Sequence, residues 1–104
     1  MTREIIEISF GNAMAQAREL DACAKCMELL VKSSLGDIQN EMALTWQGNN
    51  ANEYFNKLNI TGDNILKTAK KLRDIAETLR RVARIFQETE TRALEIARQR
   101  TYGS

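Results

Sequence analysis

The stretch Thr45-Trp46-Gln47-Gly48-Asn49-Asn50 lies near the midpoint of the 104-residue chain and holds its only tryptophan. Gly48 and the two asparagines that follow it favour a turn, because glycine adopts positive φ freely and asparagine tolerates the left-handed region. Long helical patterns precede and follow this stretch. The sequence therefore predicts one all-α domain, an antiparallel two-helix hairpin with Trp46-Gln47-Gly48 at its tip.

Before the turn, which we place at residues 45–50, apolar residues recur every three or four positions, as on one face of a helix. Ser9 and Asn12 are both candidates for the N-cap. We therefore expect the first helix to start between residues 9 and 13, to end near residue 44, and to follow a flexible segment, 1–8. The apolar positions are Phe10, Ala13, Ala17, Leu20, Ala24, Met27, Val31, Leu35, Ile38 and Met42.

After the turn, residues 51–100 are expected to form the second helix, and 101–104 a tail. Large side chains recur in steps of seven at Leu58, Ile65, Leu72, Leu79 and Phe86. Ala93 continues the same steps of seven. Four residues after each of these six positions the side chain is small, except where Glu90 interrupts the column: Gly62, Ala69, Ala76, Ala83, Glu90 and Ala97. Small side chains beside large ones let a neighbouring helix approach closely, and a sustained seven-residue repeat predicts left-handed supercoiling.

Gly62-Asp63-Asn64 is the weak point of the second helix, because glycine inside a helix costs about 1 kcal/mol relative to alanine. One interpretation is a turn, with Asp63 capping a separate helix. The other is close helix contact at Gly62, since Gly36 and Gly62 lie at similar distances from Gly48 along the two arms.

A lone two-helix hairpin leaves one side of each apolar stripe uncovered. The stripes therefore predict a partner hairpin, and the simplest product is a four-helix bundle, formed as a homodimer or with a different chain. The residues expected in the hairpin or dimer core are Leu20, Met27, Ile38, Leu58, Ile65, Leu72, Leu79 and Phe86.

The net charge of +1 gives no reason to expect a nucleic-acid or membrane partner. Residues 1–45 carry four bases and seven acids, and residues 50–104 carry eleven bases and seven acids, so the two arms have opposite signs. Asp74 and Glu77 lie among the bases from Lys67 to Arg84 at three- and four-residue spacing, as on a solvated helix face. A basic helical nucleic-acid binder remains an alternative, and its binding would fall steeply with salt.

No catalytic constellation is visible, because the chain has no histidine to act as a general base and no glycine-rich phosphate loop. We therefore expect neither an enzyme nor a cofactor. Cys23-Ala24-Lys25-Cys26 has C-x-x-C spacing but lies well inside the first helix. A structural zinc site needs four ligands, and the chain has two cysteines and no histidine. A C-x-x-C metal or redox protein is nevertheless kept as the alternative from another class.

No stretch has the apolar core of a secretory signal peptide or the roughly 20 apolar residues of a membrane span. If the protein leaves the cell, we expect it to do so without a general secretory signal and without inserting into the membrane.

Two long helices in about a hundred residues, with Trp46 and Gly48 at the bend, resemble the Trp-X-Gly (WXG) family of type VII secretion substrates, which includes the early-secreted-antigen-like proteins. That family carries a Tyr-x-x-x-Asp/Glu export motif in the distal part of its second helix. Glu90 matches the acidic position here, whereas Phe86 replaces the tyrosine and lacks its hydroxyl.

The resemblance implies secretion of a folded bundle from the bacterial cytoplasm. It implies that two hairpins pair antiparallel, which brings Trp46 of one near Phe86 and Glu90 of the other. The membrane-embedded ATPase of the secretion machine would read this composite surface. A close alternative is a helical targeting partner of a larger LXG-type toxin, which the loss of the tyrosine hydroxyl would suit.

Overall fold

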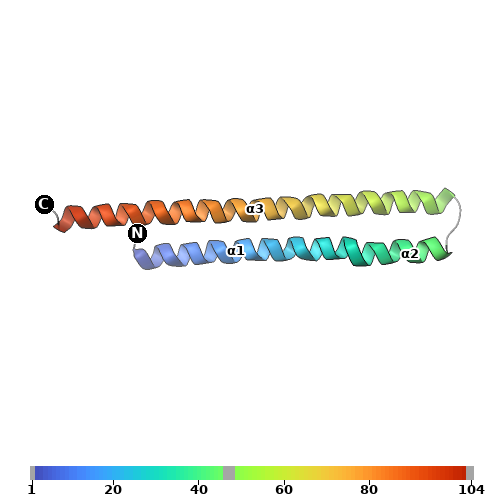
Figure 1. The fold of residues 1–104 in the computed structure, drawn as a ribbon, viewed down its shortest axis with the longest axis horizontal. Helices are drawn as coiled ribbons and strands as arrows, with labels where there is room; N and C mark the ends of the chain where they lie inside the picture. Colours follow the sequence, from blue (N-terminus) through green and yellow to red (C-terminus); the bar gives the residue numbers. More distant parts are fainter. Residues whose placement is uncertain (1, 46–48, 103–104) are drawn as a thin grey trace. The chain divides into compact units, whose positions relative to one another are not determined.

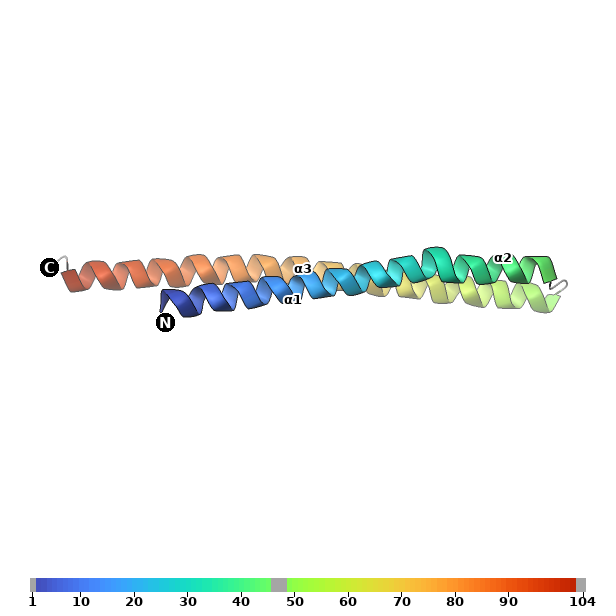
Figure 2. The same cartoon turned by 90° about the horizontal axis from the view of Figure 1, so that it is seen from below.

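The structure is a computed structural model that describes residues 2–45 and 49–102, and all of these except Thr2 are helical (Figure 1). The elements are α1 (Arg3–Leu29), the π-helix η1 (Leu30–Leu35), α2 (Gly36–Thr45) and α3 (Asn49–Tyr102). The chain divides into two compact units, one of Met1–Leu20 with Asp74–Ser104 and one of Asp21–Arg73. In each unit, the segment that precedes the turn lies beside α3 and runs in the opposite direction (Figures 1 and 2). The prediction of an all-α helical hairpin is confirmed.

The first helix begins at Arg3, earlier than the range 9–13 expected from its capping candidates. Thr2 acts as the cap, because its side-chain oxygen accepts a hydrogen bond from the Ile5 amide at 3.3 Å and its carbonyl accepts one from Ile6 at 3.1 Å. Ile6 is fully buried against α3, so tertiary packing also holds this first turn. Residues 3–8, which were expected to be flexible, are therefore helical.

The first arm is not one uninterrupted α-helix. The π-helix η1 adds one residue to the helical repeat, and this changes which residues after Val31 face α3. We call the line of contact between the two helices the seam. As a result Gln39 faces α3, and its amide donates a hydrogen bond to Asn59 Oδ1 at 2.7 Å. Ile38, expected in the core, is 44% exposed and lies outside the core of this hairpin.

The second helix passes through Gly62-Asp63-Asn64 without a break, which excludes a turn at this point. A Cβ atom on Gly62 would lie 3.4 Å from Val31 Cγ1 and 3.6 Å from Leu35 Cδ1. Gly62 therefore lies at a helix–helix contact, as in the second of the two interpretations, and a Cβ atom there would make ordinary van der Waals contact.

The helices of each unit meet through small side chains. In the unit of residues 1–20 and 74–104 the buried apolar residues are Ile6, Ala17, Ala76 and Ala83, and in the unit of residues 21–73 they are Ala24, Ala51 and Ala69. The large column that was expected in the core lies at the edge of this seam. Leu20, Met27, Leu58, Ile65, Leu72 and Leu79 are half-buried, and Phe86 is 36% exposed. Alanine and glycine bring the backbones so close that larger side chains are displaced to the side.

Candidate partner-binding surface

One exposed column of α3 carries no charge along its whole length. Its members are spaced seven residues apart, and each is aromatic or β-branched: Tyr54, Thr61, Thr68, Ile75, Val82, Thr89 and Ile96. Ile75 and Val82 are more than half exposed, at 53% and 54%. We call this set the uncharged column. Exposed apolar side chains that gather on one face of a helix, as Ile75 and Val82 do here, are characteristic of a surface that another element covers.

In the unit of residues 1–20 and 74–104, the uncharged column borders an apolar groove between α1 and α3. The groove is lined by Ser9, Phe10, Ala13, Leu79, Val82, Ala83 and Phe86. Every one of these side chains is uncharged, and the two phenylalanines come from different helices. The groove can therefore receive apolar side chains from a helix laid along it.

The unit of residues 21–73 has a comparable groove, lined by Met27, Leu30, Thr61, Asn64, Ile65 and Thr68. Thr61 and Thr68 belong to the uncharged column, and Leu30 is 46% exposed. Each unit thus leaves an uncharged seam edge open. The prediction that the apolar stripes exceed what one hairpin can cover is consistent with both grooves.

Charged side chains line a different seam edge in each unit. In the unit of residues 21–73, Arg73 forms an ion pair with Glu28, with Nη2 and Nε at 2.6 Å and 2.7 Å from Oε1, and its Nη1 lies 3.7 Å from Asp21 Oδ1. The groove on this side is lined by Glu28, Leu66, Ala69, Lys70 and Arg73.

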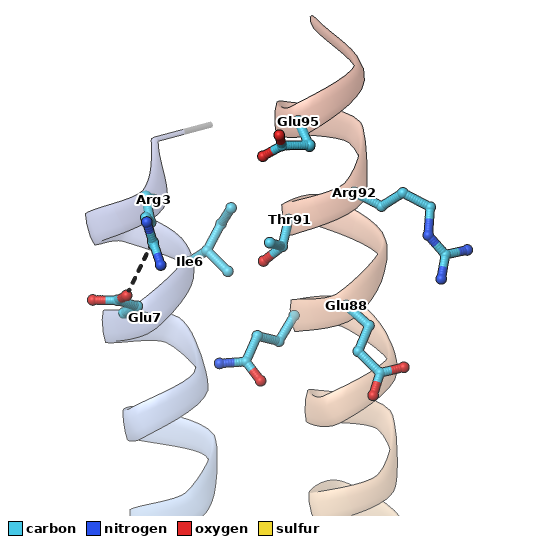
Figure 3. A pocket seen from close by; sticks show the side chains of 8 residues that line it. Arg3, Ile6, Glu7, Glu88, Thr91, Arg92 and Glu95 are labelled. Carbon is cyan, nitrogen blue, oxygen red and sulfur yellow. Dashed lines mark ion pairs between the residues drawn. The ribbon is translucent and has the colours of Figure 1, made fainter. Parts of the chain in front are cut away.

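In the other unit, charged residues line an open groove between the first turns of α1 and the distal part of α3 (Figure 3). Arg3 pairs with Glu7 at 3.6 Å, and Ile6 lies between them and α3. Glu88, Arg92 and Glu95 lie on the α3 side of this groove. Each unit therefore has one uncharged seam edge and one charged seam edge, which gives the hairpin segment a defined face for a partner.

The structure places the predicted recognition residues on two different columns. Phe86 lies in the large column and lines the apolar groove. Glu90 lies in the small column with Ala76 and Ala83, where it is partly buried. Within the part of the chain that the structure describes, its carboxylate has no hydrogen-bond or ion-pair partner. Trp46 and Gly48 lie outside the described residues.

Cys23 and Cys26 are both exposed free thiols on α1. Among residues 2–45 and 49–102, no three of the Cys, Asp and Glu side chains gather in a way that could hold a metal ion. Over the same residues, no helix is long and apolar enough to cross a membrane.

Two interhelical contacts were not anticipated from the sequence, the ion pair of Arg73 with Glu28 and the hydrogen bond of Gln39 with Asn59. A signal for the first is present, since Asp21 and Glu28 are seven residues apart and Arg73 lies four residues after Ala69 of the small column. No comparable signal exists for the second, because it depends on the residue added by η1.

Comparison with protein-family models, with curated proteins and with solved structures finds no match to this chain.

Proposed function

We propose that this chain is a non-enzymatic helical hairpin that pairs through its uncharged seam edge into a four-helix bundle, and that the bundle is a substrate of type VII secretion. The observation that carries the pairing is the open apolar groove beside Val82 and Phe86, which continues the uncharged column of α3. Covering such a surface is favourable by about 25 cal/mol for each Å² of apolar area removed from water.

The export part of the proposal is supported by the sequence motif and by the position of one side chain. Trp46 and Gly48 lie between the two arms in the sequence, and Phe86 and Glu90 lie on the distal part of α3. Glu90 is the acidic member of an otherwise small column, and its carboxylate is open to water, because no side-chain oxygen of the described residues is buried without a hydrogen-bond partner. The Glu90 carboxylate is therefore accessible for a contact with another protein.

A targeting partner of a larger LXG-type toxin is the second candidate. It is favoured by Phe86, which keeps the aromatic ring of the family motif but lacks the tyrosine hydroxyl. In that case the helical N-terminal domain of the toxin takes the place of the second hairpin on the same groove.

The first experiment measures the solution mass of the purified chain by light scattering with size-exclusion chromatography. A stable dimer supports the self-paired bundle. A well-folded monomer over the whole accessible concentration range contradicts self-pairing, and mixing with a candidate toxin domain then tests the second candidate.

An export assay tests the recognition residues in a bacterium that has a type VII system. Glu90→Gln and Trp46→Ala should reduce the secreted fraction while the cellular level stays unchanged. Glu88→Gln is the matched control, because Glu88 is an exposed acid on the same helix outside the small column. Equal secretion of the Glu90→Gln and Glu88→Gln proteins would contradict the assigned role of Glu90.

A further inference from the structure

The residue that η1 adds to the first arm decides which side of α2 faces α3. Each residue of an α-helix turns the chain by about 100°. In an uninterrupted helix the seam position seven residues after Val31 is Ile38. With the π-helix in place, Gln39 occupies that position and Ile38 is 44% exposed.

The sequence of this arm is also compatible with a second packing, in which the arm is one continuous α-helix. Val31, Leu35, Ile38 and Met42 are all apolar, and their spacing of four, three and four is that of one face of a continuous α-helix. The hydrogen bond between Gln39 and Asn59 sets the register of the two helices. In this register the half-buried Phe55 and Leu58 of α3 lie within reach of this part of the first arm. Residues 36–45 therefore have two apolar-compatible ways to pack on α3.

In the observed packing one polar contact joins α2 to α3, and two others lie within the first arm around η1. Gln39 Nε2 donates to Asn59 Oδ1 at 2.7 Å, the Ser33 hydroxyl donates to the Leu29 carbonyl at 2.7 Å, and the Gly36 amide donates to the Ser33 carbonyl. All three contacts are at or near the surface, where the net value of a hydrogen bond is modest because water competes for both partners. Burial of Ile38 opposes them, because it removes a large aliphatic side chain from water.

The seam opposite η1 has room for the change. Gly62 lies against Val31 and Leu35, and it presents no side chain to either. At this glycine, therefore, no side chain of α3 stands in the way when the π-helix rewinds into an α-helix. A π-helix within an α-helix is often found where a segment has a functional rearrangement.

We infer that η1 is a register switch for α2. In one state the π-helix is present, Gln39 contacts Asn59 and Ile38 faces solvent. In the other state the arm is a continuous α-helix, α2 is rotated by about 100° and Ile38 replaces Gln39 in the seam. The rotation extends to Thr45, the last residue of α2, which directly precedes Trp46 in the sequence. The inference requires neither pairing nor export.

The test measures how fast a thiol at position 38 reacts with a maleimide. Ile38→Cys is introduced after Cys23→Ser and Cys26→Ser have removed the two exposed native thiols. Asn59→Leu is then added, which removes the acceptor for Gln39 and supplies an apolar neighbour for the α-helical state. We expect the thiol at position 38 to react more slowly in the Asn59→Leu protein than in its parent, because the state that buries it becomes more populated.

Three controls separate rotation from other causes. Asn56→Leu makes the same substitution at another exposed asparagine of α3 and should leave the rate unchanged. Deletion of Ser34 shortens the arm by one residue, so that a continuous α-helix keeps Gln39 in the seam, and Asn59→Leu should then have no effect. Gln39→Leu together with Asn59→Leu supplies an apolar pair for the observed register at unchanged chain length, and should keep the thiol reactive.

Circular dichroism verifies that each variant is helical before its labelling rate is compared. An unchanged rate after Asn59→Leu would overturn the switch. Equal slowing in the chain that lacks Ser34, or in the Gln39→Leu variant, would also overturn it, because the leucine side chain introduced at position 59 would then cover the thiol without any rotation of α2.

Discussion

A methyl group added at Gly62 would make ordinary contact with Val31 and Leu35, at 3.4 Å and 3.6 Å. Alanine also restricts the unfolded chain and favours the helix over glycine by about 1 kcal/mol. We therefore expect Gly62→Ala to raise the free energy of unfolding by about 1 kcal/mol, measured by urea unfolding followed by circular dichroism. Gly62→Leu should lower it, because its side chain would push the helices apart. A less stable Gly62→Ala protein would contradict the observed contact distances.

Ala76 has no exposed surface and lies in the seam. A larger side chain there separates the helices, and overpacking of a close-packed site costs about 1–3 kcal/mol. We expect Ala76→Leu to lower the free energy of unfolding by that amount. Ala22→Leu is the matched control on an exposed position of α1 and should change stability by less than about 0.5 kcal/mol. Equal stability of the two leucine variants would show that the alanine seam does not limit helix separation.

At the scale of the element, Arg73 links α3 to two acids of α1, Glu28 and Asp21. The Arg73 side chain is 44% exposed, so water and salt screen both ion pairs. We expect Arg73→Ala to cost no more than about 1 kcal/mol in low salt and less in 1 M salt. Arg81→Ala, at an exposed base of the same helix, is the control. If the Arg73→Ala effect is independent of salt, the lost interaction is packing and not charge.

Local sequence predicted α3 better than it predicted the first arm. The seven-residue repeat of α3 continues through Gly62, and the repeat correctly outweighs the low helix propensity of one glycine. In the first arm the same reasoning missed the start at Arg3 and the π-helix at Leu30–Leu35. The start at Arg3 depends on a tertiary contact, the burial of Ile6, which propensity and period do not encode. The π-helix breaks the period itself, and it accompanies the hydrogen bond between Gln39 and Asn59.

At the scale of the whole molecule, the proposed pairing depends on the uncharged column. Val82 is 54% exposed in the hairpin, so a charge at this position leaves the fold of the single chain intact. In a bundle the same charge would be buried without a partner. We expect Val82→Glu to weaken self-association by more than about tenfold, which corresponds to about 1.4 kcal/mol, in sedimentation or light-scattering titrations.

Arg84→Glu is the matched control for that titration, because it changes charge on the same turn of α3 outside the uncharged column. This substitution should change the dissociation constant of the dimer by no more than about two- to threefold, as expected for a change of charge at the rim of an interface. If Val82→Glu and Arg84→Glu weaken association equally, the apolar groove is not the pairing surface.

The apolar pattern of the sequence identified the positions that form the grooves, but this pattern did not divide them into core and surface. The pattern identified Phe86, Leu79 and Met27 as apolar positions on a helix face, yet these side chains line open grooves in the single hairpin. The reason is that alanines bring the two backbones close enough to fill the seam themselves. A binary apolar pattern does not show which apolar column lies at the point of closest approach, whereas side-chain size does.

The alanine seam has a further consequence for how the chain finds one alignment. Most of the buried side chains are alanines seven residues apart, Ala17 and Ala24 on α1 and Ala69, Ala76 and Ala83 on α3. A slide of one helix past the other by seven residues, about 10 Å, would therefore again bring alanine near alanine. Arg73 would still meet a carboxylate after such a slide, because Asp21 and Glu28 are themselves seven residues apart. Correct alignment therefore depends on contacts that do not repeat, Ile6 in one unit and, in the other, the Gln39–Asn59 pair with the contact of Gly62 against Val31 and Leu35. Loss of either would produce helical, compact but misaligned chains, whose far-ultraviolet spectra match the native one and whose interhelical distances do not.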